Sequence, residues 1–175
     1  MDRRPARRRI AVAATATAVL AAGTFALGAG VAGADARGKG EKHAKPATKA
    51  QVLGLFDDWN AALQTGDPKK VADLYAKDAV LLPTVSNQVR TDRAAIVDYF
   101  EHFLQNKPVG TKTESVVNVL DRDTVIDTGV YEFALTDHET GEKSTVKARY
   151  TYAYEKQPNG KWLIVNHHSS KMPQG

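Results

Sequence analysis

The sequence contains no cysteine in its 175 residues. This absence excludes disulfide bonds, catalysis by a thiolate and metal sites with cysteine ligands. It is compatible with an exported protein that needs no disulfides for its stability. The sequence also lacks a glycine-rich loop after any predicted strand, which argues against nucleotide binding by a phosphate loop, and it lacks the signature motifs of a protein kinase.

A basic surface for nucleic acids is missing as well, although the net charge of the chain is +4. Residues 1–34 carry a charge of +4, and residues 35–50 carry a charge of +3. Residues 51–175 hold 14 basic and 17 acidic side chains, so this part of the chain is mildly acidic. A nucleic-acid-binding domain would show basic residues clustered on one face. We therefore expect no nucleic-acid partner.

The first 34 residues have the pattern of a secretory signal peptide. Five arginines within the first nine residues precede an uncharged, alanine-rich stretch over residues 10–31. Small residues around Ala34 and Ala36 then fit a cleavage site after either residue. We expect a secreted, extracytoplasmic protein without stable membrane insertion after cleavage. The alternative is an uncleaved anchor, because the uncharged stretch is long enough to span a bilayer.

The composition then divides the rest of the chain into a linker and one domain. Residues 35–50 are polar, basic and interrupted by glycine and proline, which predicts a flexible basic linker. The globular domain is expected over residues 51–175.

Three helices are predicted in the first half of this domain. Apolar residues at intervals of three and four indicate a helix over residues 52–63. Asp67 and Pro68 are typical of a helix start and predict a short second helix, whose apolar face includes Tyr75. Thr91 or Asp92 caps the third helix, which is expected to stop at residues 107–110.

From residue 111 the apolar period changes to two, which indicates strands. A short strand is predicted at residues 79–82, and longer strands at residues 113–120, 124–135, 144–155 and 161–169. Helices followed by hairpin-linked strands predict an α+β fold. The last strand is apolar on both faces, with Trp162 and Ile164 alternating with Leu163 and Val165. Because a strand with one wet face alternates apolar and polar residues, we expect a second subunit to cover its outer face.

A series of short motifs follows in order along residues 51–173. They are Trp59 with Thr65-Gly66-Asp67, Leu74-Tyr75-Ala76-Lys77-Asp78-Ala79, Leu82-Pro83, Arg90-Thr91-Asp92-Arg93, Asp98-Tyr99-Phe100, Gly160-Lys161-Trp162 and His168-Ser169-Ser170-Lys171-Met172-Pro173. The series resembles the calcium/calmodulin-dependent protein kinase II association domain in a stand-alone bacterial form, within the nuclear transport factor 2-like (SnoaL-like) superfamily. The resemblance implies a cone of three N-terminal helices on a strongly curved, mainly antiparallel sheet, and a homo-oligomer of at least two subunits.

The resemblance also implies a cavity between the helices and the sheet. The kinase association domain lines this cavity with arginines on three strands, and the matching positions here are Tyr131, Tyr152 and Ser169. We therefore expect an aromatic, hydroxyl-lined pocket for a small, largely apolar ligand, and not a clamp for a carboxylate. Trp59 and Tyr99 complete either the core or the wall of this pocket.

Alternation along the strands assigns side chains to faces. On the third long strand it places on one face, which we expect to be the concave side, Val146, Ala148, Tyr150, Tyr152 and Tyr154. The resemblance places Asp127 inward on the second long strand, and it places inward on the last strand Leu163, Val165, His167 and Ser169. Asp127 and His167 are the candidate catalytic residues, because a carboxylate and an imidazole in one dry cavity can perform acid–base chemistry. In the alternative, His167 bonds a tyrosine and Asp127 lies near a wet rim.

Arg149 and His168 are expected to face outward at a dimer interface, or to turn into the pocket through a bulge. Because His167 and His168 alternate faces, they cannot bind one metal ion together, and we expect neither a metal nor another cofactor.

Three functions fit these patterns. The first is a secreted, non-enzymatic, oligomer-forming association-domain-like protein with a small-molecule-binding cavity. The alternative is a cofactor-independent enzyme, an isomerase, a cyclase or a so-called oxidoreductase of polyketide-like substrates, that uses Asp127 and His167. The third is a partner-binding module in which the tether matters more than the cavity.

Overall fold

The computed structural model describes residues 45–173, so the predicted signal peptide and most of the predicted linker lie outside the described residues. The first elements are helix α1 (Lys49–Gln64), helix α2 (Pro68–Ala72), strand β1 (Tyr75–Leu82), helix α3 (Arg93–Phe103) and the 3-10 turn η1 (Leu104–Asn106). Four strands follow as a meander: β2 (Val109–Val119), β3 (Thr124–Thr136), β4 (Lys143–Lys156) and β5 (Trp162–Lys171).

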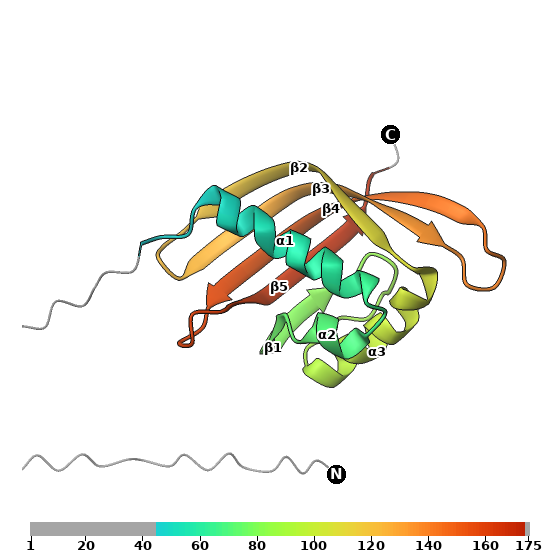
Figure 1. Cartoon of the computed structure of the whole chain (residues 1–175), viewed down its shortest axis with the longest axis horizontal. Coiled ribbons are helices and arrows are strands. Elements are labelled where there is room, and N and C mark those ends of the chain that lie inside the picture. Colours follow the sequence, from blue (N-terminus) through green and yellow to red (C-terminus); the bar gives the residue numbers. More distant parts are fainter. Residues whose placement is uncertain (1–44, 174–175) are drawn as a thin grey trace, which may run out of the picture. The chain divides into compact units, whose positions relative to one another are not determined.

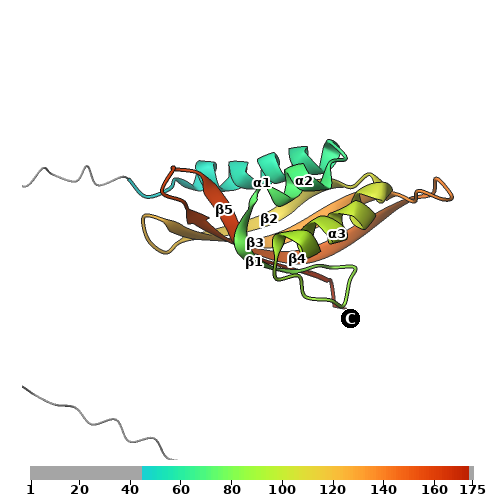
Figure 2. The ribbon, with the colours of Figure 1, turned by 90° about the horizontal axis from the view of Figure 1, so that it is seen from below.

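The strands form one sheet in the order β1-β5-β4-β3-β2. Strand β1 runs parallel to β5, and every other neighbouring pair is antiparallel. Helix α1 lies across the long strands, and α2 and α3 lie next to β1 (Figure 1). The view turned by 90° shows α1 on one side of the curved sheet (Figure 2). The predicted α+β fold is confirmed: three N-terminal helices pack on a curved, mainly antiparallel sheet.

Each helix begins where the sequence provides a cap. At the start of α1 the Thr48 side chain accepts a hydrogen bond from the Gln51 backbone amide, and the Gln51 side chain accepts one from the Thr48 backbone amide. Helix α1 therefore begins inside the segment predicted as linker. Asp67 accepts bonds from two backbone amides at the start of α2. Asp92, not Thr91, caps α3 and accepts a bond from the backbone amide of Ala95. These bonds satisfy amides that have no partner within the helix.

Strands β1 and β2 both begin earlier than predicted. Tyr75, assigned to a helix face from periodicity, is the first residue of β1, because β1 pairs with β5 through long-range contacts that local periodicity does not report. Strand β2 starts at Val109 because Asn60 on α1 holds it. The Asn60 side-chain amide donates to the Gly110 carbonyl at 2.9 Å and accepts from the Gly110 amide at 2.8 Å.

The inward row of β4 carries four consecutive buried positions, at Ala148, Tyr150, Tyr152 and Tyr154. This row was predicted from alternation alone. With Trp59, the tyrosines are among the largest fully buried side chains of the described residues. The core is therefore an aromatic layer between α1 and the sheet.

On β5 the predicted alternation is wrong in its first half. Ile164, which is 1% exposed, points inward, and Leu163 and Val165 do not take that place. The cause is a β-bulge, since the register between β4 and β5 shifts by one residue at Val165. Beyond the bulge, His167 and Ser169 point inward as predicted.

Candidate functional site

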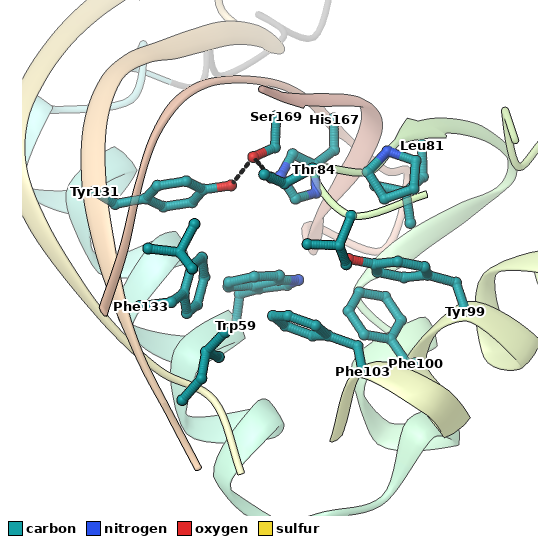
Figure 3. Close-up of a pocket in the computed structure, with 14 residues that line it drawn as sticks. Trp59, Leu81, Thr84, Tyr99, Phe100, Phe103, Tyr131, Phe133, His167 and Ser169 are labelled. Carbon is teal, nitrogen blue, oxygen red and sulfur yellow. Dashed lines mark hydrogen bonds between the residues drawn. The ribbon is translucent and has the colours of Figure 1, made fainter. Parts of the chain in front are cut away.

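A small, partly enclosed cavity lies between the concave face of the sheet and the helices (Figure 3). Its enclosed volume is about 20 Å³. A single water needs roughly 10–15 Å³ by this measure, so the cavity as it stands admits a water molecule and nothing larger. Six aromatic side chains line its wall: Trp59, Tyr99, Phe100, Phe103, Tyr131 and Phe133.

A chain of three hydroxyl groups lines one side of the cavity. The Tyr131 hydroxyl donates to Ser169 Oγ at 2.5 Å, and Ser169 Oγ is bonded in turn to Thr84 Oγ1. Burial raises the pKa of Tyr131 to about 12, and the bonds to Ser169 and Thr84 oppose part of this rise. Tyr131 therefore stays a neutral donor at physiological pH. Of the predicted pocket residues, Trp59, Tyr99, Tyr131 and Ser169 line the cavity.

Thr84, in the loop after β1, also lines the cavity and was not predicted from the sequence. No local pattern marks it, because it reaches the cavity only through the parallel pairing of β1 with β5. That pairing sets Leu82 opposite His168 and so brings the next residues of the chain beside Ser169. Thr84 could have been predicted as a cavity residue only if the parallel pairing of β1 with β5 had been expected.

His167 reaches the cavity from β5 and is 3% exposed. Its Nδ1 is bonded to the Tyr75 hydroxyl at 2.9 Å, and the Trp59 indole N–H donates to the same hydroxyl at 3.1 Å. The ring stacks on Tyr152 with the ring centroids 4.0 Å apart. Burial, assisted by His168 nearby, lowers the pKa of His167 to about 3. The imidazole is therefore neutral at physiological pH.

The hydrogen bonds also fix which nitrogen of His167 carries the proton. The Tyr75 oxygen already accepts a bond from Trp59, so its own hydroxyl hydrogen is free to be donated to His167 Nδ1. The opposite tautomer would leave both that hydrogen and the Nε2 lone pair unpaired inside the core, which costs free energy. The proton accordingly sits on Nε2, and this atom is buried without a partner among the described residues.

Asp127 belongs to a different cluster. It is fully buried and accepts bonds at Oδ1 from Ser115 Oγ and from the Tyr150 hydroxyl, the latter at 3.3 Å. Burial raises the pKa of Asp127, while the bond from Ser115 and the charge of Lys112 oppose the rise. Gly129 permits this arrangement: a Cβ there would lie 2.0 Å from the Glu114 carbonyl oxygen at the β2 bulge.

The structure does not bring Asp127 and His167 together. They share one cross-strand row, but Tyr152 on β4 stands between them, paired with Asp127 on one side and with His167 on the other. Two steps across a sheet separate backbones by about 10 Å. Asp127 does not line the cavity. Tyr152, a predicted pocket residue, is also absent from the cavity wall and packs in the core instead.

The opposite face of the same strands is open. Arg149 and His168 both lie there, exposed, so the outward orientation predicted for them is confirmed and neither turns into the cavity. They border a shallow groove of about 470 Å³ that runs over β2–β5 and includes Val116, Val130 and Thr151. Val116 is 55% exposed. All residues that line this groove belong to strands, and no helix of residues 45–173 contributes to it.

Two further observations concern residues 45–173 alone. Nowhere in that range do three histidine or acidic side chains gather in a way that could hold a metal ion. No helix in the same range has the length and apolar character needed to cross a membrane.

Comparison with known proteins assigns the chain to a family. The calcium/calmodulin-dependent protein kinase II association domain family matches residues 48–173. The chain belongs to this family. It is 57% identical to a Xanthomonas campestris protein described by the same domain name, with a TM-score of 0.70; the match covers 75% of this chain and 96% of the other. Comparison with curated proteins gives no match.

More distant solved structures share the fold. A nuclear transport factor 2-like superfamily protein from Salmonella enterica is 13% identical, with a TM-score of 0.63, and the match covers 71% of this chain and 91% of that protein. A ketosteroid isomerase-like protein from Erwinia carotovora atroseptica is 16% identical, with a TM-score of 0.60, and the match covers 71% of this chain and 96% of that protein. At such identities the association domain shares their architecture, and the likeness does not extend to their chemistry.

Proposed function

We propose that this association-domain protein is secreted and forms a homo-oligomer of at least two subunits through the outer face of its sheet, and that its cavity takes a small molecule. The observation that carries the assembly is the open groove over β2–β5, since no described element covers it. Val116 and Val130 supply apolar contact area in this groove, while Arg149 and Glu114 supply opposite charges on one face.

Opposite charges within one patch suit a two-fold interface. In such an interface the same patch meets itself, so each copy must be complementary to its own surface. Glu114 and Arg149 lie in one cross-strand row, on either side of Val130. A second copy turned by 180° can set its acidic end against the basic end of the first. The charged pairs would then fix how the two copies align, and the valines would pack against each other at the centre of the interface.

The acid–base alternative finds less support in the geometry. General acid–base chemistry needs both groups within hydrogen-bond reach of the reacting atoms. Asp127 is separated from the cavity by Tyr152. The Nε2 of His167 already carries a proton, so it would act as a donor and not as a base.

Export is inferred from residues 1–34, whose arginine-rich start, alanine-rich middle and small residues fit a signal peptide. Mass analysis of the protein recovered outside the cells tests this part. A first residue close to position 35 or 37 is the expected result, and a chain retained whole in the membrane would contradict it.

Sedimentation velocity of the intact chain tests the assembly. Thr151 lies in the groove on β4, and an arginine there would place bulk and charge at the centre of the proposed interface. We expect an oligomer for the wild-type chain and a monomer for Thr151→Arg. Thr145→Arg is the matched control, because Thr145 lies on the same strand and face but outside the groove. A wild-type monomer at tens of micromolar would contradict the proposal.

A further inference from the structure

We propose that the cavity binds a neutral ligand through a carbonyl-type oxygen, which accepts the hydrogen bond that His167 Nε2 has to offer, and that the cavity rejects carboxylates. This inference rests on the cavity that forms one part of the proposed function, and it is independent of the assembly through the outer face.

The first observation is the unpaired Nε2 of His167. It is buried and has no partner among the described residues, although it is held in place by Tyr75 on one side and by stacking on Tyr152. An unpaired buried donor destabilises the folded state by about 1–3 kcal/mol. An acceptor that enters the cavity would recover part of that free energy, which gives the ligand a defined anchoring point.

The second observation is a count of hydroxyl hydrogens. Tyr131 donates to Ser169, and the remaining bond joins Ser169 to Thr84. Whichever of these two donates in that bond, the other keeps one hydroxyl hydrogen without a partner among residues 45–173. The cavity thus presents a second donor besides His167, which is either Ser169, two residues along the same face of β5, or its bonded neighbour Thr84. Two donors and no obligatory acceptor favour a ligand that carries oxygen acceptors.

The third observation is that the cavity contains no positive charge. None of its lining side chains is a lysine or an arginine, and His167 is neutral. Arg90 lies in the neighbouring groove, where it forms an ion pair with Asp98 at 2.5 Å. A carboxylate would lose its hydration in the cavity without gaining a counter-charge, and that loss disfavours it strongly. The same donors would bind a neutral carbonyl without this cost.

Access to the cavity passes through three side chains. A surface groove of about 320 Å³ lies next to it, and both spaces are lined by Val85, Tyr99 and Phe103. These residues form the partition between groove and cavity. Because the space inside the cavity admits only a water molecule, a larger ligand has to displace these side chains. Its apolar part then packs against the aromatic wall.

Three probes of nearly equal shape test the inference by calorimetry on the intact chain. Acetophenone presents a neutral carbonyl, α-methylstyrene replaces that carbonyl by a carbon–carbon double bond, and benzoate replaces it by a carboxylate. We expect acetophenone to bind about tenfold more tightly than α-methylstyrene, the equivalent of one hydrogen bond. Benzoate is expected to give no measurable binding at pH 7.

Variants of the two adjacent histidines test whether His167 causes the preference for acetophenone. His167→Phe keeps an aromatic ring but removes the donor, so the preference of acetophenone over α-methylstyrene should fall to about one. His167→Gln keeps a donor and should retain part of the preference. His168→Phe is the matched control on the outer face and should leave the preference unchanged. If His167→Phe does not fold, the relative affinities of the three probes for the wild-type chain still test the inference.

Three results would overturn the inference: benzoate binding as tightly as acetophenone, no binding of acetophenone, or an unchanged preference in His167→Phe. Light scattering on the same samples reports the number of subunits separately. A monomer that still prefers acetophenone refutes the assembly and supports the cavity inference. An oligomer that binds benzoate equally well refutes the cavity inference alone.

Discussion

His167 and His168 are adjacent on β5, and they occupy opposite environments. His167 is packed between aromatic rings on the concave face, bonded to Tyr75 and stacked on Tyr152. His168 is exposed on the outer face, at the border of an uncovered groove. Because successive side chains of a strand point to opposite faces, one histidine is buried and neutral while the next is exposed to solvent.

The same contrast extends to β4. Tyr150, Tyr152 and Tyr154 fill the core, while Arg149 and Thr151, on either side of Tyr150, face outward. The two faces thus serve different tasks in our account: the concave face holds a cavity with donors and no charge, and the outer face offers charge and apolar area to a second copy.

The largest effect is expected for truncation inside the sheet. Tyr152 is fully buried, so Tyr152→Ala should lower the free energy of unfolding by about 3–5 kcal/mol. Its hydroxyl has no partner among the described residues, so Tyr152→Phe should be nearly neutral. Thr151→Ala, one residue away on the outer face, should change the stability of the subunit by less than about 0.5 kcal/mol. Urea unfolding of the three variants measures these differences, and a costly Tyr152→Phe would contradict the position of the ring.

The second prediction concerns acid. The pKa of His167 is about 3 in the folded chain and about 6.5 when unfolded, so the unfolded chain binds the extra proton between these values. His167 does not lower the free energy of unfolding above about pH 6.5. As the pH falls from there toward 3, the free energy of unfolding decreases by up to about 1.4 kcal/mol per pH unit. The groups that face His167 are Trp59, Tyr75 and Tyr152, with His168 adjacent.

Urea unfolding at about pH 7 and pH 5 measures this loss. His167→Gln should show a flatter dependence on pH than the wild-type chain, because glutamine does not titrate. His168→Gln, changed on the outer face, should keep the wild-type slope. Equal slopes in all three proteins would contradict the assignment of the acid sensitivity to the concave face.

These effects separate what the sequence predicts well from what it does not. Alternation correctly placed the buried tyrosines of β4 inward, and the resemblance correctly placed Asp127 of β3 inward. Both hold because these strands pair without interruption in the register between them. The same rule failed at Ile164, because the bulge at Val165 arises from the long-range pairing of β5 with β4. Local patterns report the period of a strand but not a shift against its neighbour.

The site was predicted less fully for a related reason. Inward orientation was correct for Asp127 and His167, but facing the same side does not mean sharing a cavity. Strand order places β4 between their strands, and the bulk of Tyr152 fills that space. Thr84 escaped the sequence analysis because only the parallel pair β1–β5 brings its loop to the cavity.

A smaller effect is expected for the buried carboxyl. Burial raises the pKa of Asp127, so the folded chain holds this proton to a higher pH than the unfolded chain. The ionised carboxylate therefore destabilises the fold above its pKa, and the cost fades as pH falls through it. Asp127→Asn should stabilise the subunit by about 1 kcal/mol at pH 7. The gain should shrink near pH 4. Thermal unfolding at both pH values measures it, and a strong loss of stability at pH 7 would show that the charge is needed.

The smallest effect on the fold is expected at the edge of the outer groove. Arg149 is exposed and its contact with Ser170 is long, at 3.4 Å. Arg149→Ala should change the unfolding free energy of the subunit by less than about 0.5 kcal/mol. It should nevertheless weaken the oligomer, with a steeper loss at low salt, where charge pairs contribute most. Sedimentation at two salt concentrations measures this, and an unchanged oligomer would remove Arg149 from the interface.

The most direct test of the division between the two faces is a nuclear magnetic resonance titration of the imidazole groups in the intact chain. Nitrogen-15 labelling reports which ring nitrogen carries the proton. Because the chain has five histidines, His167→Gln and His168→Gln are both needed to assign the two rings. Our account predicts that the signals of His167 stay fixed from about pH 8 to pH 5, with a proton on Nε2 and none on Nδ1. A His167 ring that takes up a proton near its ordinary pKa of about 6.5 would contradict the account.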